Sequence, residues 1–173
     1  MEHVCHFCVR RPDMRQRTFY EDEHWFACLA APPNLRGHAI LAAKSFGECP
    51  RTLTAGILGG IHTALAEVAR VLTVHYRPKH VLFASLRVKD PHIHLHMFPV
   101  TNEQEEEWRK RKGAGYDSGR FLEFLGDQER DSTSAHRFER ERNGWTDEHE
   151  RLAYADALSS EVAALTKIAK TKG

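Results

Sequence analysis

The sequence of 173 residues predicts an α+β fold, with a mainly antiparallel sheet and one long helix between strands. Two short strand patterns, residues 18–20 and 24–29, flank an acidic, hairpin-like turn at residues 21–23. Apolar residues at three- and four-residue spacing over 52–75 predict the helix. A strict alternation of histidine and apolar residues from His92 to Met97 predicts a further strand.

The remaining elements of the sheet follow from local composition. The Pro32-Pro33-Asn34 segment breaks the chain, and Gly37 precedes a β-like run over 38–43. Thr52 is the expected N-cap of the long helix, and Gly59-Gly60 weakens the middle of that helix. A strand over 81–84 completes the predicted sheet before the histidine strand.

The character of the chain changes after Pro99. We expect a charged helix over 103–112 and an amphipathic helix from Asp147 to Lys170, whose apolar face packs against the domain or a partner subunit. This face comprises Leu152, Ala155, Leu158, Val162, Leu165 and Ile168. The sequence therefore divides into a domain over 1–105 and a helical C-terminal extension over 106–173.

Composition excludes some function classes. The 25 Lys and Arg residues nearly cancel the 24 Asp and Glu residues, so nothing points to nucleic acid or a membrane surface. No run of about 18 apolar residues predicts a membrane span, and the N-terminus lacks the basic and apolar regions of a signal peptide. We expect a cytoplasmic protein, in which the four cysteines are thiols or metal ligands instead of disulfides.

On the predicted strand, His92, His94 and His96 share one face, while Ile93, Leu95 and Met97 point into a core. Three imidazoles on one face place near-neutral acid, base or nucleophile groups within reach of one substrate. They could also form a metal site or a solvated polar face.

The run resembles the His-φ-His-φ-His-φ-φ pattern (φ apolar) of the histidine-triad (HIT) superfamily of nucleotidyl hydrolases and transferases. Cys5-x-x-Cys8, residues 20–23, Gly37-His38 and Lys44 follow in the family's order. The resemblance covers roughly residues 4–100. It implies the histidine-triad architecture, commonly as a homodimer, and a nucleotide substrate without an organic cofactor.

The resemblance also implies the residue roles. His94 is the nucleophile, which attacks the α-phosphorus of a nucleoside phosphate conjugate and forms a nucleotidyl-histidine intermediate. His96 contacts phosphate oxygens and helps the leaving group. His38 hydrogen-bonds within the cluster, and a backbone carbonyl fixes the tautomer of His94. A nucleotidyltransferase or phosphorylase using the same intermediate, or a non-catalytic nucleotide-binding module, are the alternatives.

Two positions depart from the family pattern. Ala30 stands where relatives carry the Asp or Asn that holds the ribose hydroxyls. The loop over 85–91, before the triad, is shorter than in relatives and has no glycine. Ser85, Arg87 and Lys89 are its candidate substrate-binding residues, and the two cations either supply positive charge to phosphates or are solvated loop charges.

The two-residue spacing of Cys5 and Cys8 allows both thiolates to reach one zinc ion. The resemblance to zinc-bearing relatives implies that His92 is a third ligand. Those relatives take the fourth ligand from a histidine shortly after the lysine that matches Lys44, but this chain has Phe46 there, and Cys49 lies three residues further on. We expect a structural zinc held by Cys5, Cys8, His92 and Cys49, with His6 as a spare ligand. The alternative is a pair of reduced cysteines. Cys28 is expected to be a small core residue.

Overall fold

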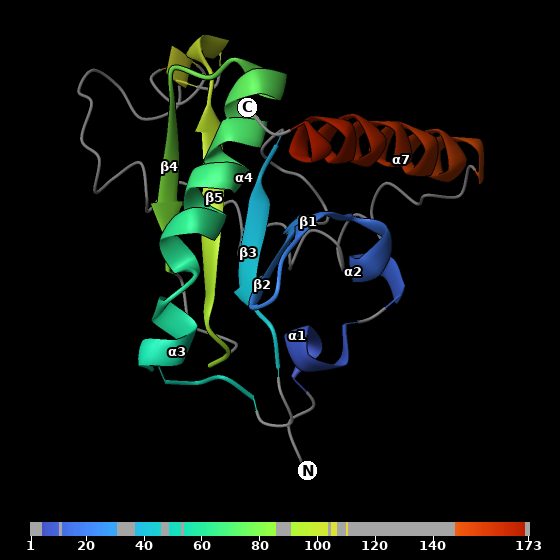
Figure 1. Ribbon diagram of the computed structural model, residues 1–173. Coiled ribbons are helices and arrows are strands. Elements are labelled where there is room, and N and C mark those ends of the chain that lie inside the picture. The colour runs from blue at the N-terminus through green and yellow to red at the C-terminus, as the bar shows by residue number, and fades with distance from the viewer. Residues whose placement is uncertain are drawn as a thin grey trace.

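Five antiparallel strands form one sheet in the order β1-β2-β3-β5-β4 (Figure 1). They are β1 Thr18–Glu21, β2 Trp25–Leu29, β3 Ala39–Ala43, β4 His80–Ala84 and β5 His94–Val100. The computed structural model describes residues 5–10, 12–30, 37–45, 49–52, 54–85, 91–103, 105–106, 110 and 148–171, and only the backbone of 148–155. The predicted α+β fold with a mainly antiparallel sheet is confirmed.

The two faces of the sheet are covered differently. One face packs under α4, Ile61–Tyr76, and α7, Glu148–Lys170, and buries Trp25, Leu41 and Met97. The other face carries Phe26 and Cys28, beside the short helices α1, His6–Val9, and α2, Pro12–Gln16. Because side chains alternate along β5, the His94 and His96 side chains lie on this second face, opposite Met97.

The helix predicted over 52–75 is present but divided in two, at the glycine pair expected to weaken it. The chain forms α3, Ala55–Leu58, and then α4. The break falls at Gly59-Gly60, because glycine is a poor helix former in a helix interior. The N-cap is Thr54 instead of Thr52, since the Thr54 hydroxyl accepts the backbone N–H of Ile57.

Strand β5 begins later than predicted. His92 lies in a bend before β5, which starts at His94. The neighbouring Ile93 still bonds to other segments, because its N–H donates to the Pro50 carbonyl and its carbonyl accepts from Ala43 N–H. His92 still lies on the same side of the sheet as His94, because both rings contact Phe7, while Ile93 between them packs into the core on the other side.

Helix α7 packs on α4 and β1 of the same chain (Figure 1). Of the predicted apolar face, Val162 and Leu165 are buried, while Leu158 and Ile168 are partly buried against the core. The Leu152 and Ala155 side chains lie outside the described residues. The division after residue 105 stays a prediction; of the charged helix predicted over 103–112, the described residues 103, 105, 106 and 110 are helical.

One helical stretch of the described chain, Ala55–Tyr76, is long and apolar enough to span a membrane by length and composition alone. The sequence did not predict a membrane span here, because polar residues interrupt the apolar run. This stretch contains the break between α3 and α4. Ala64, Val68, Val71 and Leu72 of α4 are buried against the sheet and α7. Packing in the core accounts for these four side chains, whereas Leu58 and Val74 are exposed.

Candidate active site and metal centre

Four side chains from three separate segments converge at the N-terminal end of β5. The Sγ atoms of Cys5, Cys8 and Cys49 each lie 3.5 Å from His92 Nδ1. All four ligand atoms lie within 4.8 Å of one another, and this is the one such group of three or more His, Cys, Asp or Glu side chains among the described residues. The four residues predicted as metal ligands from the sequence are thus brought together.

The geometry of this tetrad fits zinc. With Zn–S about 2.3 Å and Zn–N about 2.0–2.1 Å, a tetrahedral site separates a thiolate sulfur from an imidazole nitrogen by about 3.6 Å. His92 Nε2 lies 2.7 Å from the Ala43 carbonyl and must donate to it, so the lone pair of the neutral ring lies on Nδ1, facing the thiols. The tetrad could therefore hold a metal ion through three sulfurs and one nitrogen.

A cation would change the charge state of the tetrad. Burial, together with hydrogen bonds to Cys5 and Cys49, raises the pKa of the Cys8 thiol to about 12. Three thiolates this close repel one another unless a cation stands between them. A divalent ion supplies that charge, so metal binding and thiol deprotonation are coupled.

The His94 side chain is held by the backbone next to the tetrad. His94 Nδ1 lies 2.7 Å from the His92 carbonyl oxygen, and since a carbonyl only accepts, Nδ1 carries the proton. The neutral His94 ring therefore has its lone pair on Nε2. Only 5% of His94 is exposed.

His38 and His96 form a second imidazole pair on the same face. His38 Nε2 lies 2.9 Å from His96 Nδ1, and the His38 ring also stacks on Phe98 with centroids 4.3 Å apart. Burial lowers the pKa of His38 well below its ordinary value, and the nearby His96 lowers it further. Burial and the neighbouring His94 lower the pKa of His96 to about 3. Both rings are thus neutral near pH 7.

An aromatic ring joins the tetrad to His94. Phe7 lies between Cys5 and Cys8 on α1 and is buried. Its ring stacks on His94 with centroids 4.7 Å apart and an interplanar angle of 27°, and it contacts the His92 ring at 5.1 Å. The segment that supplies two candidate metal ligands therefore also covers the His94 imidazole.

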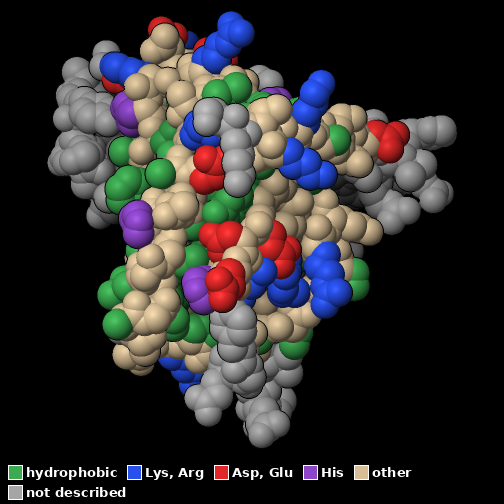
Figure 2. All heavy atoms as spheres, viewed as in Figure 1, with side chains coloured by type: hydrophobic (Ala, Val, Ile, Leu, Met, Phe, Trp, Pro, Cys, Tyr) green, Lys and Arg blue, Asp and Glu red, His purple; other side chains and the backbone are tan. Residues whose placement is uncertain are grey.

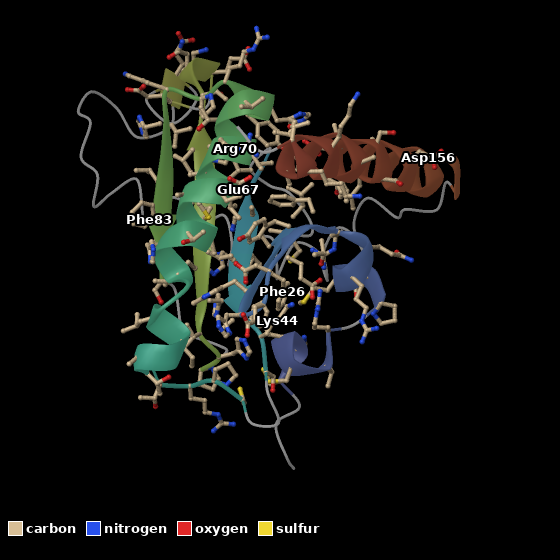
Figure 3. All side chains as sticks on the ribbon, viewed as in Figure 1. Phe26, Lys44, Glu67, Arg70, Phe83 and Asp156 are labelled. Carbon is tan, nitrogen blue, oxygen red and sulfur yellow. The ribbon has the colours of Figure 1, made fainter. Side chains whose placement is uncertain are left out.

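An ion-pair network fastens α1 to the first hairpin. The Arg10 guanidinium donates two hydrogen bonds to the Glu21 carboxylate, at 2.8 and 2.9 Å, and lies over the Phe26 ring. Lys44 Nζ pairs with the same carboxylate at 2.8 Å. Arg10 and Lys44 hold the pKa of Glu21 at about 2. Figure 3 shows Phe26 and Lys44 on this side of the molecule.

A member of the HIT family from Bacillus subtilis has a similar solved structure. Its TM-score is 0.51 at 21% sequence identity, over 67% of this chain and 83% of the other. The chain has the histidine-triad fold. A HIT family protein from Bacillus anthracis (TM-score 0.47, 22% identity, 77% and 98% of the two chains) also matches, but we draw nothing from a score this low.

A third solved structure, described as a Hit-like protein involved in cell-cycle regulation from Bartonella henselae with an unknown ligand, has a TM-score of 0.47. Its identity is 15%, over 58% of this chain and 84% of the other, and it likewise carries no weight here. No family model matches the sequence, and no curated protein does either.

The structure brings together the candidate histidines predicted from the sequence. His38, His92, His94 and His96 are all buried near one another on one face. Ser85 is exposed at the end of β4. Arg87 and Lys89 lie outside the described residues. Cys28 is fully buried, as predicted for a core residue, and its burial raises its pKa to about 11.

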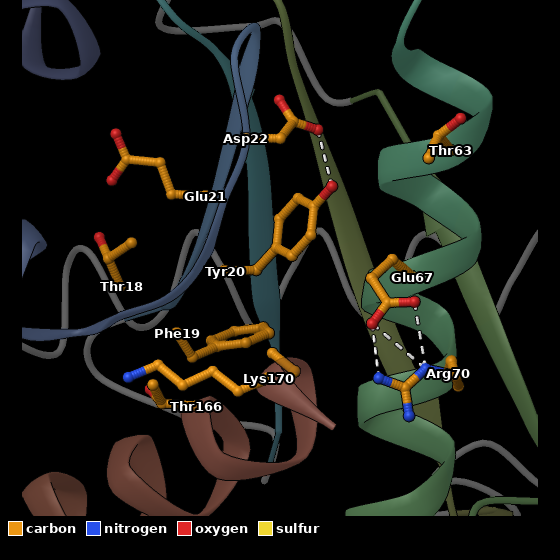
Figure 4. A pocket seen from close by; sticks show the side chains of 11 residues that line it. Thr18, Phe19, Tyr20, Glu21, Asp22, Thr63, Glu67, Arg70, Thr166 and Lys170 are labelled. Carbon is orange, nitrogen blue, oxygen red and sulfur yellow. Dashed lines mark hydrogen bonds and ion pairs between the residues drawn. The ribbon is translucent and has the colours of Figure 1, made fainter. Parts of the chain in front are cut away.

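A large open cavity of about 1050 Å³ lies away from the histidines of the HIT fold, between β1, α4 and α7 (Figure 4). On its walls Tyr20 donates to Asp22 and Arg70 pairs with Glu67. The residues that line it include none of the four histidines. Acidic and basic side chains are interspersed on the helix-covered face of the molecule (Figure 2). We place the chemistry at the histidines, because this cavity holds no comparable group.

Sequence reasoning missed Phe7 and Phe98, which stack on the histidines, and the Ala43 carbonyl, which sets the His92 tautomer. Phe7 had one visible signal, its place between two cysteines. An aromatic residue there is equally compatible with simple packing. The Ala43 carbonyl left no signal, because any residue at that position carries one.

Proposed function

We propose that the protein is a nucleotidyl hydrolase that acts at the α-phosphate of a nucleoside phosphate conjugate, of the phosphoramidate or dinucleoside polyphosphate type. The observation that carries this proposal is the hydrogen bond from His94 Nδ1 to the His92 carbonyl, 2.7 Å long. It directs the Nε2 lone pair of a neutral imidazole away from the backbone, which is the form that attacks phosphorus. The HIT fold supports the assignment to nucleotide chemistry.

The reaction takes two displacements. His94 Nε2 attacks the α-phosphorus, the P–N bond forms, and the bond from phosphorus to the leaving group breaks as the leaving group takes up a proton from solvent. Water then attacks the same phosphorus and gives up a proton to solvent, and cleavage of the P–N bond releases the nucleoside monophosphate and restores His94. Splitting one hard displacement in two is the advantage of a covalent intermediate.

In this scheme His96 contacts the phosphate oxygens and assists the leaving group. In the hydrogen bond between His38 Nε2 and His96 Nδ1, the proton can lie on His38, so that His96 Nδ1 accepts. The neutral His96 ring then carries its own proton on Nε2, which can donate to a phosphate oxygen. His38 then acts as a positioning residue, and its low pKa keeps the pair neutral. Stabilising the charge that develops on phosphate oxygens is the main task of protein groups in phosphoryl transfer.

Zinc is the metal we propose for the tetrad. Cys5, Cys8, Cys49 and His92 would hold it, and four protein ligands leave no open position for substrate, so the ion would be structural. Its chemistry is to tie the N-terminal segment to the bend before β5. His92 would thus be a metal ligand through its side chain and a partner of His94 through its backbone.

The nucleoside end of the substrate is where this chain departs from its relatives. The Ala30 backbone N–H donates to the His38 carbonyl at 2.8 Å, and its methyl group cannot hold ribose hydroxyls. Arg87, Lys89 and Ser85 stay our candidates for contacts with the phosphates. There are two alternatives: transfer of the nucleotidyl group to phosphate or another acceptor in place of water, and nucleotide binding without catalysis. Ala30 favours nucleotide binding without catalysis, and the His94 geometry opposes it.

The test incubates purified protein with adenosine 5′-phosphoramidate, diadenosine tetraphosphate and ADP, with and without inorganic phosphate. We expect nucleoside monophosphate from at least one conjugate, and a loss of more than about 1000-fold in His94→Ala. His62→Ala, which removes an exposed histidine of α4, is the matched control and should keep full activity. Release of a nucleoside diphosphate only when phosphate is present would identify a phosphorylase. Absence of turnover by the parent, with nucleotide binding equal in parent and His94→Ala, would refute the enzyme.

A cytoplasmic homodimer stays our expectation. Phe83, 62% exposed on the edge strand β4 and pointing out of the molecule in Figure 3, supports a partner on that side. Light scattering should give twice the chain mass for the parent and the single mass for Phe83→Lys. The single mass for both proteins would contradict the dimer.

A further inference from the structure

The hydrogen bond to the His92 carbonyl does not by itself hold the His94 ring. It holds the Nδ1 atom at one point, but a single hydrogen bond does not keep the imidazole from rotating out of the bonding direction, which breaks the bond and frees the tautomer. A nucleophile that swings loses the alignment of its lone pair with the phosphorus, and small misplacements cost large factors in rate. Something else must therefore restrain the imidazole plane.

The Phe7 ring is in the right place for this task. It lies against His94 with centroids 4.7 Å apart and planes only 27° apart, while the His96 ring meets His94 edge-on at 5.1 Å and 67°. A stacked ring resists rotation of its neighbour out of the common plane. The His94 imidazole is thus restrained at one atom, on one face and at one edge.

The Phe7 ring is itself fixed from two sides. Its neighbours Cys5 and Cys8 both reach the His92 imidazole, and the turn that carries them is closed by the bond from Val9 N–H to the Cys5 carbonyl, 3.2 Å long. Arg10 follows in a left-handed conformation, with φ of 41°, and clamps on Glu21. The backbone that carries Phe7 therefore cannot move away from His94 without moving the tetrad or breaking this ion pair.

We propose that Phe7 is a positioning residue for His94, through which the metal-ligating turn of α1 sets the orientation of the nucleophilic imidazole. This role rests on the proposed function for its kinetic part only. It gives the cysteine-bearing turn a task beyond stapling the N-terminus to the sheet. The side chain acts through its contact with His94.

The test compares Phe7→Leu, which removes the ring and keeps an apolar side chain, with Phe7→Tyr, which keeps the ring. Phe19→Leu is the matched control, because Phe19 is equally buried but lies on the opposite, helix-covered face. Metal content is measured in all four proteins by elemental analysis. The His94 ring is followed by its nitrogen-15 shifts at one fixed pH, which report the tautomer without any substrate.

We expect Phe7→Leu to bind as much metal as the parent and to lower kcat for adenosine 5′-phosphoramidate by about tenfold, the upper end of what an aromatic contact contributes. KM should change less than about twofold, since binding contacts are untouched. The nitrogen shifts of His94 should move from a single Nδ1–H tautomer toward an average of two. Phe7→Tyr should restore kcat and tautomer, and Phe19→Leu should alter neither.

Three results would overturn the proposal. One is an unchanged His94 tautomer in Phe7→Leu. Another is loss of metal from Phe7→Leu, because Phe7 would then serve the tetrad alone. The third is an equal change in Phe19→Leu, because the effect would then follow from stability. Should the parent not turn over the phosphoramidate, the proposed function fails, while the tautomer measurement still decides the role of Phe7.

Discussion

Replacing Gly37 by alanine tests how much the free energy of unfolding depends on a glycine just before His38 and β3. Gly37 has a φ of +82°, a region that residues with a Cβ atom rarely adopt. A Cβ atom there would lie 2.6 Å from Pro99 Cγ and 2.7 Å from Tyr76 Cε2. Neither neighbour can move away easily, because the Pro99 ring is buried and the Tyr76 hydroxyl donates to Glu161.

The cost has two parts. The left-handed backbone costs alanine about 1–2 kcal/mol, and overpacking against Pro99 and Tyr76 costs about 1–3 kcal/mol. We therefore expect Gly37→Ala to lower the free energy of unfolding by about 2–5 kcal/mol. Urea unfolding followed by the fluorescence of the fully buried Trp25 and by circular dichroism measures this value.

Gly56→Ala is the matched control. Its Cβ atom would meet only Thr54 Oγ1, at 4.0 Å, and Gly56 lies inside the helix α3. This substitution should raise the free energy of unfolding by about 0.5–1 kcal/mol, because alanine is the better helix former. A loss below about 0.5 kcal/mol in Gly37→Ala would show that the loop relaxes without cost, and the reasoning would fail.

Three further predictions concern the metal, the histidine pair and α7. The zinc content should fall from about one ion per chain in the parent to well below half in Cys49→Ser after dialysis, while Cys28→Ala keeps the content of the parent. Equal zinc contents in both variants would exclude Cys49 as a ligand. The folded state holds the pKa of His96 near 3, against about 6.5 in the unfolded chain, so this group contributes its full stability above pH 6.5. The free energy of unfolding should fall by about 2 kcal/mol through His96 by pH 5, and His38 acts in the same direction. Urea unfolding at each pH checks this, and a flat profile would contradict it. Leu165→Ala should cost about 2–5 kcal/mol by the same assay, against less than about 0.5 for the exposed Leu58→Ala; equal losses would mean that α7 does not pack as described.

Local sequence patterns were sufficient where the structure is local. The alternation from His92 to Met97 predicted which side chains share a face. Ile93 and Met97 are buried in the core as expected, whereas Leu95 is only half-buried. The apolar spacing over Asp147–Lys170 predicted α7 almost to the residue. These succeed because a strand repeats every two residues and a helix every 3.6, whatever surrounds them.

Local patterns failed where two tendencies compete. The periodicity over 52–75 favoured one helix, but Gly59-Gly60 interrupted it and Thr54 captured the cap. The histidine alternation likewise favoured a strand through His92, yet β5 begins at His94 and His92 lies in a bend, where its side chain faces the cysteines. The glycine pair outweighed the helical period, whereas the bend shortened the strand without changing the face on which His92 lies.

The sequence by itself determined the three histidines, their common face and the cysteine spacing that predicts a metal site. Only the tertiary structure decided that Cys5, Cys8 and Cys49 meet at His92 Nδ1, across 87, 84 and 43 positions of the chain. It also decided that the Ala43 and His92 carbonyls set the tautomers of His92 and His94, and that Phe7 covers the His94 ring. The reason is physical. Backbone carbonyls carry no signature in the sequence, and a ring between two cysteines is equally compatible with simple packing. The partners of these groups are chosen by the pairing of β3 with β5 and by the fold of the N-terminal segment onto them.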